Sequence, residues 1–465
     1  MSNAQITAES IDLISPDIPV SRDSMGLFVD YLLSGRKSCA EWKCGLEFET
    51  FGFAAQNLER LSPVAVQQIL TNMATSSDQL IYEEETLVEA SVTLNDKLRG
   101  NITIEPGGQI EFSSVARRAL SEIELDLDLY LKRLRTLSQQ HGFIFIGGGF
   151  DPLRRPEEQR YFPKQRYQIM RPYLAGRGRR AQDMMDRTCA VQVNLDYSSE
   201  AGLGRMFSLA NRIAPIVTAI FSCSPFCDGK PSGYKSTRAA AWLETDDDRA
   251  GISPLAFSET DDDFSFESYV NYLCEVPMLV ARRLGRHINV AGIKFGSFLD
   301  GAYPDATPVF QDFTDHLTSI FTEARIKRYL ELRSVDCCNP KFALAACALW
   351  RGLLYDDVAL EDARKLMLKL VPIFEPVEYK NLQISVARHA LQAKIGKTGV
   401  LDIAREIIKL AQYGLERFAP QETTYLDPLY ELVIEDELTL ADVLLRNWHG
   451  SWHGSITKVI DYLRI

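Results

Sequence analysis

The sequence predicts an α+β protein built on one antiparallel sheet that has a polar face and an apolar face. Strand-like segments lie mainly in the first three-quarters of the chain, whereas helical spacing dominates from about residue 341. Four of the strand-like segments also carry acidic or amide side chains at every second position. This alternation is typical of antiparallel strands that pack on a core with one face only.

The composition is that of a globular protein with a large core. The chain has 465 residues, of which 46% are hydrophobic and 25% are charged, and its formal net charge is −12. The acidic balance argues against a nucleic-acid partner, because binding a phosphate backbone requires a basic face. The most apolar run, 209–226, contains Arg212 and two prolines, so we reject it as a membrane span.

The amino-terminal segment and the cysteines bear on location. No basic region followed by an apolar stretch is present at the start, so a secretory signal is not expected. The nine cysteines are then most simply reduced thiols. We expect a cytoplasmic protein, monomeric or homodimeric, that acts on small molecules.

The first third of the chain alternates between helical and strand-like segments. The amphipathic helix in this part ends at a glycine, which is a typical helix stop. The expected order is a flexible tail (1–21), a helix (23–36), a strand (43–53), a helix (57–75), a strand-like stretch (101–114), a helix (122–142) and a short apolar strand (143–150).

The remainder begins with an irregular segment and ends in helices. Residues 157–187 are basic and contain glycines, which predicts a functional loop with a short helix, and the connection 224–251 is rich in Asp and Gly. Between and after them we expect a strand (188–197), a helix (201–221), a strand around Glu331 and three helices (343–357, 359–371 and 401–418).

The polar positions of the four strands are nearly all carboxylates and amides. They are Glu47 and Glu49; Glu105, Gln109 and Glu111; Thr188, Gln192, Asn194 and Asp196; and Glu331 with Arg333. If the strands share one sheet, five glutamates gather on one face, and their repulsion must be neutralised. Oxygen-bound divalent cations do this, and Mg²⁺ in particular is held by a few carboxylates and ligand phosphates. The alternative is an ordinary solvated face.

The basic segment supplies the opposite charge. It concentrates seven cations within about two dozen residues: Lys164, Arg166, Arg171, Arg177, Arg179, Arg180 and Arg187. Arginine suits bidentate capture of phosphate or carboxylate. Together with the acidic strands, this segment favours a metal–nucleotide site, and a solvated basic loop is the alternative.

Seven motifs, in order, resemble the plant and proteobacterial type of glutamate–cysteine ligase. They are GLEFETFGF, TIEPGGQIEFS, YFPKQRYQIMRPYL, DMMDRTCAVQVNLDYSSE, SPFCDGKPSGYKSTRAAAW, DDDRAGISPLAF and HLTSIFTEARIKRYLELRSVD. The likeness implies a glutamine-synthetase-like fold, in which the polar face of a curved antiparallel sheet binds Mg²⁺ and ATP and helices pack behind. It also implies a ligase-like domain over 22–340 and a helical region, 341–465, packed on the same domain.

The resemblance further implies a reaction and the residues that perform it. The reaction joins the γ-carboxylate of glutamate to the amine of cysteine through a γ-glutamyl phosphate, as the first step of glutathione biosynthesis. Arg333 and Glu331 would be catalytic, with Arg333 facing the transferring phosphoryl group. The implied Mg²⁺ ligands are Glu47, Glu49, Glu105, Glu111, Gln192 and Glu331, and the implied substrate pocket contains Arg166, Arg238, Thr188, Asn194 and Trp242.

Two departures from the family pattern stand out. Leu46, Phe48 and Thr50 replace the Thr, His and Lys of the more common motif GTEHEKFGF. Strand alternation places all three on the apolar face, so we expect repacking and no loss of metal binding. The stretch SVDCCNPKFALAA (334–346) replaces a segment with glycine and tryptophan near the pocket, which leaves the amine acceptor open. A ligase for another amine and a non-catalytic nucleotide-binding homologue are the alternatives.

Overall fold

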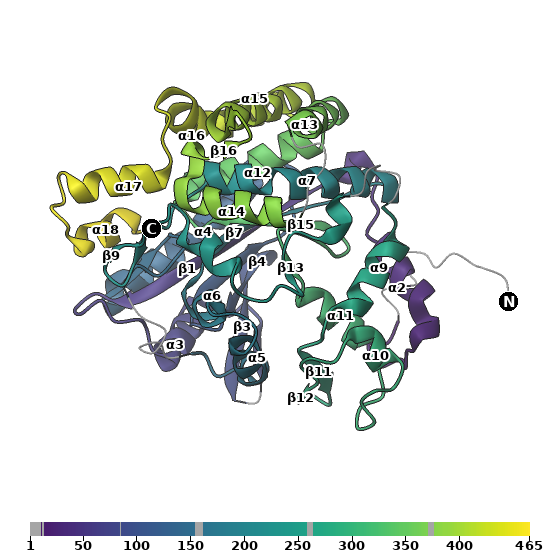
Figure 1. The fold of residues 1–465 in the computed structure, drawn as a ribbon. Helices are drawn as coiled ribbons and strands as arrows, with labels where there is room; N and C mark the ends of the chain where they lie inside the picture. The colour runs from purple at the N-terminus through teal and green to yellow at the C-terminus, as the bar shows by residue number, and fades with distance from the viewer. Residues whose placement is uncertain (1–10, 12–13, 84, 154–160, 258–263, 371–375) are drawn as a thin grey trace.

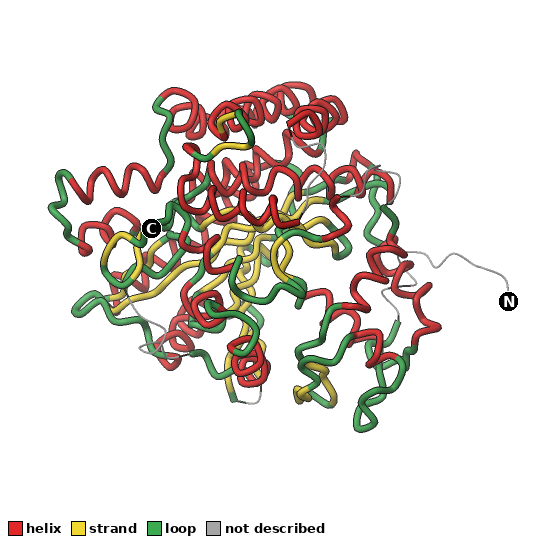
Figure 2. The backbone as a smooth tube through the Cα atoms, viewed as in Figure 1, coloured by secondary structure: helices red, strands yellow, loops and turns green. Residues whose placement is uncertain are grey.

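A nine-stranded antiparallel sheet forms the centre of the computed structural model, which describes residues 11, 14–83, 85–153, 161–257, 264–370 and 376–465 (Figures 1 and 2). The sheet is open, with β14 at one edge and β2 at the other. Its order is β14 (Ala324–Ile326), β15 (Leu330–Asp336), β7 (Ala190–Leu195), β1 (Cys44–Ala54), β5 (Ile110–Ser114), β4 (Lys97–Ile104), β3 (Thr86–Leu94) and β2 (Leu80–Glu83), and β6 (Phe143–Ile146) pairs with the far end of β1.

The four strands expected to share a polar face are neighbours in this sheet, as predicted. The stretch 101–114 is not one strand, however, but the hairpin β4–β5. Pro106 offers no N–H for a ladder, and Gly108 takes a positive φ of 78°, so the chain reverses there. The Glu105 N–H donates to the Gln109 carbonyl at 2.9 Å and closes the turn. Strands β2 and β3 were not predicted.

The apolar face of the sheet is the main core. Leu46 and Phe48 of β1 are fully buried, whereas Glu47 and Glu49 point to the other face and are partly exposed. Thr50, the third departure from the common motif, is also buried, and its hydroxyl donates to the Ile110 carbonyl at 3.2 Å. The three departures in the opening motif therefore lie on the packed face, as predicted, while the expected retention of metal binding stays a prediction.

Three helices, α4 (Leu120–His141), α7 (Glu200–Ile220) and α12 (Pro340–Leu354), pack on this apolar face. Their bounds lie close to the expected ones, and Gly142 ends α4 with a φ of 67°. The expected helix 57–75 is shorter, because Ser62 accepts a hydrogen bond from Ala65 N–H and Pro63 occupies the first helical position of α3 (Pro63–Met73).

The basic segment is more ordered than the sequence indicated. It contains α5 (Gln165–Ala175) and α6 (Ala181–Arg187), which are separated by Gly176 and Gly178, while 157–160 lie outside the described residues. The expected tail is not free throughout: Val20 is buried, and its N–H donates to the Pro308 carbonyl at 3.0 Å.

The other helices surround the sheet in two groups (Figure 1). One group lies near the amino-terminal helix and comprises α2 (Met25–Leu33), α9 (Phe266–Glu275), α10 (Phe295–Leu299), α11 (Phe310–Thr318) and the hairpin of β11 (Val280–Arg283) and β12 (Arg286–Asn289). The carboxy-terminal helices form the second group: α13 (Asp357–Leu370), α14 (Pro376–His389), α15 (Val400–Phe418), α16 (Asp427–Leu429), α17 (Leu440–His449) and α18 (Ile456–Leu463). No helix in the described ranges has the length and apolar character of a bilayer span.

Candidate active site

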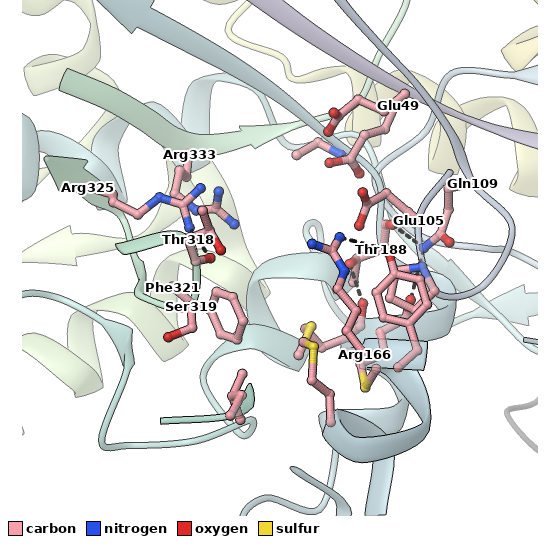
Figure 3. A pocket seen from close by; sticks show the side chains of 18 of the residues that line it. Glu49, Glu105, Gln109, Arg166, Thr188, Thr318, Ser319, Phe321, Arg325 and Arg333 are labelled. Carbon is pink, nitrogen blue, oxygen red and sulfur yellow. Dashed lines mark hydrogen bonds between the residues drawn. The ribbon is translucent and has the colours of Figure 1, made fainter. Parts of the chain in front are cut away.

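A cavity of about 370 Å³ lies on the polar face of the sheet (Figure 3). The sheet strands β1, β5, β7 and β15 supply one wall. Helices α5, α6, α8 (Thr237–Trp242) and α11 and the β11–β12 hairpin supply most of the remainder, and Arg325 and Lys327 line the cavity from the β14–β15 hairpin. In Figure 3, Arg325 and Arg333 lie on one side of the cavity, and Glu49, Glu105 and Arg166 lie on the other. The cavity therefore joins the acidic strands to the basic segment, but of the seven cations expected to supply the opposite charge only Arg166 is among its lining residues. Others pair with acids elsewhere, as Arg171 does with Asp186 and Arg180 with Asp183.

Strand register aligns the acidic side chains in rows across the sheet. Glu49 of β1 pairs with Glu111 of β5, which pairs with Thr103 of β4, which in turn pairs with Glu89 of β3. In the neighbouring row, Glu47 pairs with Gln192 of β7. Side chains at paired positions lie within about 5.5 Å at the Cβ atoms, so these carboxylates are close enough to repel one another.

Burial and mutual repulsion change the acidity of these glutamates. Burial and then the nearby Glu105 raise the pKa of Glu49 to about 8. Burial and then Glu47, Glu105 and Glu49 raise the pKa of Glu111 well above its usual range. A neighbouring hydrogen-bond donor lowers the pKa of Glu49 in part: Ala190 N–H donates to Glu49 Oε2 at 2.8 Å.

The donor set fits a hard divalent cation, although the carboxylates are not gathered around one point. In the described part of the chain, no three His, Cys, Asp or Glu side chains form a ready-made metal centre. Each glutamate is hydrogen-bonded to a different neighbour: Asn194 Nδ2 donates to Glu47 at 2.8 Å, and Thr103 Oγ1 donates to Glu111 at 3.0 Å. A bound cation would relieve the repulsion that raises the pKa values of these acids.

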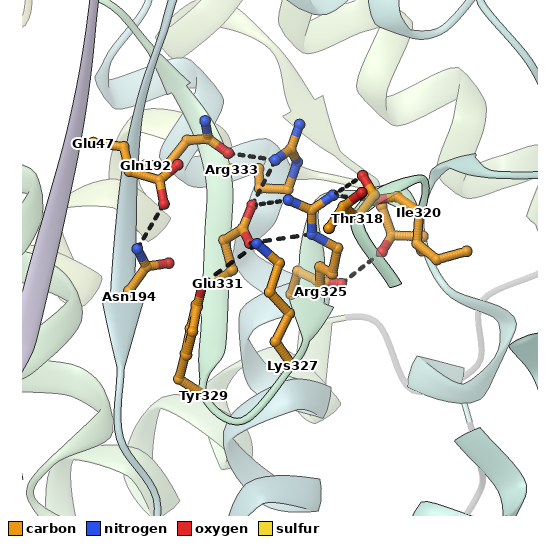
Figure 4. A network of polar contacts seen from close by, with 12 residues as sticks. Glu47, Gln192, Asn194, Thr318, Ile320, Arg325, Lys327, Tyr329, Glu331 and Arg333 are labelled. Carbon is orange, nitrogen blue, oxygen red and sulfur yellow. Dashed lines mark hydrogen bonds and ion pairs between the residues drawn. The ribbon is translucent and has the colours of Figure 1, made fainter. Parts of the chain in front are cut away.

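Glu331 is held in a cluster of cations beside the cavity (Figure 4). Its carboxylate receives two hydrogen bonds from Arg325, at 2.5 and 3.1 Å, one from Arg333 at 2.6 Å, and an ion pair with Lys327 at 2.8 Å. Burial alone would raise the pKa of Glu331, but Arg325, Lys327 and Arg333 lower it well below its usual range. Glu331 therefore stays ionised and neutralises part of a positive cluster.

The arginines and the tryptophan of the cavity contact one another. Arg333 donates to the Gln192 side chain, and its guanidinium lies 5.7 Å from the ring centre of Trp242. Arg238 Nη2 donates to the Arg333 carbonyl at 2.8 Å. Arg166 donates to the Tyr167 hydroxyl at 3.0 Å, and its Nε is buried without a partner among the described residues.

The structure brings ten of the twelve expected site residues to the cavity lining. These are Glu47, Glu49, Glu105, Glu111, Gln192, Arg333, Arg166, Arg238, Thr188 and Trp242. The Thr188 hydroxyl donates to the Met184 carbonyl at 2.6 Å. Asn194 and Glu331 do not line the cavity. They are instead paired with each other on the neighbouring strands β7 and β15.

Sequence reasoning missed two cations of the cavity, Arg325 and Lys327. Arg325 lies on β14 directly opposite Glu331, and Lys327 follows at the turn between β14 and β15. The motif ARIKRYLELR carries the signal that could have found them. Its pattern is that of a hairpin. The cations Arg325 and Lys327 alternate in the first half, and the charged residues Glu331 and Arg333 alternate in the second.

The fold is that of the glutamate–cysteine ligases. The chain superposes on a glutamate–cysteine ligase from Francisella tularensis, solved in complex with AMP, with a TM-score of 0.53 and 12% identity over 91% of this chain and 87% of that one. A bifunctional glutathione synthetase from Pasteurella multocida gives a TM-score of 0.50 with 11% identity over 95% of this chain and 53% of that one. The expected mixed fold of helices and an antiparallel sheet is confirmed.

The chain belongs to glutamate–cysteine ligase family 2, whose family model matches residues 43–461. It is 36% identical to the chloroplastic glutamate–cysteine ligase of Brassica juncea over 96% of this chain and 84% of that enzyme. The chloroplastic enzyme of Arabidopsis thaliana is also 36% identical, over 96% and 83% of the two chains. The family predicted from the ordered motifs is confirmed.

The same relatives overturn the expected location. The plant enzymes that the chain resembles are chloroplastic, whereas we expected a cytoplasmic protein. The expectation was wrong because it rested on the lack of a secretory pattern, and that pattern does not distinguish the cytoplasm from an organelle.

Proposed function

We propose that the protein is an ATP-dependent glutamate–cysteine ligase that makes γ-glutamylcysteine, the first step of glutathione biosynthesis. The observation that carries this proposal is the match to the ligase family over residues 43–461, combined with a cavity that sets a row of glutamates opposite arginines. ATP would transfer its γ-phosphoryl group to the γ-carboxylate of glutamate. The cysteine amine would then attack the acyl carbon, losing a proton as phosphate leaves.

The side chains of the cavity suit separate parts of this reaction. Arg333 stabilises negative charge on the transferring phosphoryl group, an electrostatic contribution that dominates phosphoryl transfer. Either Arg166 or Arg238 clamps a carboxylate of glutamate, because both line the cavity with an Nε that has no partner among the described residues. Trp242 and Thr188 shape the wall beside them.

Mg²⁺ would be held by the oxygens of Glu47, Glu49, Glu105, Glu111 and Gln192. When bound, the ion offsets the charge of the phosphates and of the carboxylates that surround them. For Glu331 we propose a different role from the metal ligand that the family likeness implied. Its carboxylate is already neutralised by three cations and keeps Arg333 in place.

The test is an incubation of the purified protein with glutamate, Mg²⁺ and ATP and a panel of amino acids, with phosphate release and products followed. Cysteine-dependent formation of γ-glutamylcysteine is the expected result. Turnover with a different amine alone would move the assignment to the second candidate, a ligase of altered acceptor, which the replaced stretch 334–346 raises. No ATP turnover with any acceptor would contradict both.

A further inference from the structure

Asp336, the last residue of β15 and of the motif HLTSIFTEARIKRYLELRSVD, is a side chain to which the reaction above gives no role. We propose that it is a positioning residue, which holds the short helix α8 against the sheet so that Arg238 and Trp242 meet Arg333. The inference rests on the proposed ligase function. Asp336 does not line the cavity, so it would act only through its neighbours.

A β-bulge in β15 brings Asp336 to the polar face of the sheet. Leu332 and Val335 pair with residues of β7 that are only two positions apart, so β15 contains one extra residue between them. Without that residue, strand alternation would place Asp336 on the core side with Leu332. With it, Asp336 pairs with Ala190, whose N–H donates to Glu49.

The Asp336 carboxylate is buried and fully engaged. Its Oδ2 accepts hydrogen bonds from the Cys223 N–H at 2.9 Å and from the Ser224 hydroxyl at 2.6 Å, and its Oδ1 accepts from the Ser236 hydroxyl at 2.8 Å. Arg238 Nη1 lies 3.9 Å from Oδ1. A buried carboxylate with this many donors is held in one orientation.

One of these donors, Ser236, is the residue that begins α8. Its hydroxyl oxygen accepts from the Ala239 N–H at 3.0 Å while its proton goes to Asp336. Asp336 therefore sets the direction of the capping hydroxyl and with it the start of the helix. Arg238 and Trp242 are four residues apart on α8 and so lie on the same side of it.

The contacts of α8 reach the proposed phosphoryl-binding arginine. Arg238 donates to the Arg333 carbonyl, and the Arg333 guanidinium lies over the Trp242 ring. Since Arg333 and Asp336 belong to the same strand, β15 fixes both ends of the arrangement. A shift of α8 would move two cavity side chains relative to Arg333, and shifts of about 1 Å can cost about 10²-fold in rate.

The backbone behind Asp336 is shaped to this side chain. A Cβ on Gly149, the last of three consecutive glycines, would lie 2.5 Å from Asp336 Cγ. Only glycine leaves room for the carboxylate at this approach. Gly149 thus allows the chain to approach the Asp336 side chain closely.

The experiment compares steady-state kinetics of the full chain and its variants with glutamate, cysteine and Mg²⁺–ATP. Asp336→Asn keeps the size of the side chain but removes the charge and one acceptor. We expect kcat to fall about 10- to 100-fold, the range for losing a supporting partner of a functional residue. KM for ATP should change much less, because Arg333 acts on the transferring group in the transition state.

Asp126→Asn is the matched control. Asp126 is also a fully buried aspartate, ion-paired with Arg99 at 3.2 Å and Arg117 at 2.7 Å, but it lies on α4 behind the sheet. This variant should lose stability and keep the kcat of its folded fraction. An Asp336→Asn enzyme whose kcat per folded molecule stays within about twofold of wild type would overturn the proposal.

Ser236→Ala keeps the test decisive if Asp336→Asn does not fold. It removes the hydroxyl that links Asp336 to α8, and it should lower kcat in the same direction with little change in KM for ATP. An unchanged kcat in this variant would also overturn the inference. A wild-type protein without any glutamate-dependent turnover would instead refute the proposed function, and this inference with it.

Discussion

Glu49 shows most clearly how burial and repulsion between carboxylates disfavour the ionised form of a side chain, because its pKa is raised to about 8. Replacing it with Gln removes one charge from the repelling set and preserves shape, so the free energy of unfolding should not decrease. Turnover should fall about 10²- to 10³-fold, because the proposed Mg²⁺ loses a ligand in a site where charge stabilisation dominates. Denaturant titration and steady-state kinetics measure the two effects.

Glu89→Gln is the control for that variant. Glu89 lies in the same register row as Glu49, on β3, but outside the cavity lining. It should keep both stability and turnover. Near-full activity in Glu49→Gln would show that the metal assignment is wrong.

Replacing Glu331 with Gln should instead lower the free energy of unfolding. Its carboxylate is fully buried among Arg325, Lys327 and Arg333, so Glu331→Gln leaves buried cations without their counter-charge. Breaking such a buried cluster costs about 3–5 kcal/mol of unfolding free energy. Urea titration at pH 7 measures the loss, and a variant as stable as wild type would contradict the role given to this residue.

The residue scale also shows the limit of reading side chains from a linear pattern. Alternation correctly assigned Glu47 and Glu49 to one face, because period two holds along an unbroken strand. It could not assign Asp336 to a face, because the bulge between Leu332 and Val335 changes the alternation and no residue type in this stretch predicts a bulge.

Among the elements, α11 carries a buried histidine that should make stability depend on pH. His316 lies at the end of this helix, stacked on Phe295 of α10, and its Nε2 contacts the Leu273 carbonyl at 3.0 Å. Burial lowers the pKa of His316 to about 3, and the nearby Arg249 also disfavours the charged form. The unfolded chain, with an ordinary histidine pKa of about 6.5, takes up the proton first.

Neutral His316 therefore does not lower the free energy of unfolding above about pH 6.5. As the pH falls from there toward 3, the free energy of unfolding decreases by about 1.4 kcal/mol per pH unit. Unfolding free energies at pH 7.5 and 5.5 measure this, with His316→Gln as the comparison. The variant should lose less stability on acidification than wild type does. Equal losses in the two proteins would contradict the prediction.

Elements with strong local signals were predicted, and those defined by chain reversal were not. The helix that ends at Gly142 has apolar spacing and a glycine stop, and its observed end agrees. The β4–β5 hairpin was read as a single strand because Glu105 and Glu111 keep the same alternation on both sides of the turn. Which strands pair is a long-range property that no local pattern contains.

At the scale of the whole molecule, we propose that the helical region 341–465 is packed on the same domain as the sheet. Helix α12 packs on β1 and β7, and the Ile465 N–H donates to the Phe145 carbonyl of β6 at 3.1 Å. A fragment ending at residue 340 exposes the apolar face of the sheet and should be insoluble or unfolded. Expression and circular dichroism of fragment 22–340 test this, and a soluble, active fragment would contradict it.

The positive cluster around Glu331 has a consequence for how ligands arrive. Three cations and one carboxylate leave this cluster positive, yet the chain as a whole carries a net charge of −12. At about 0.15 M ionic strength the screening length is about 8 Å, so an approaching anion senses the acidic exterior before this cluster. Added salt should weaken this repulsion and speed the encounter with ATP. Stopped-flow binding rates that fall as salt is raised from low concentration would show that the cluster attracts the ligand over a long distance.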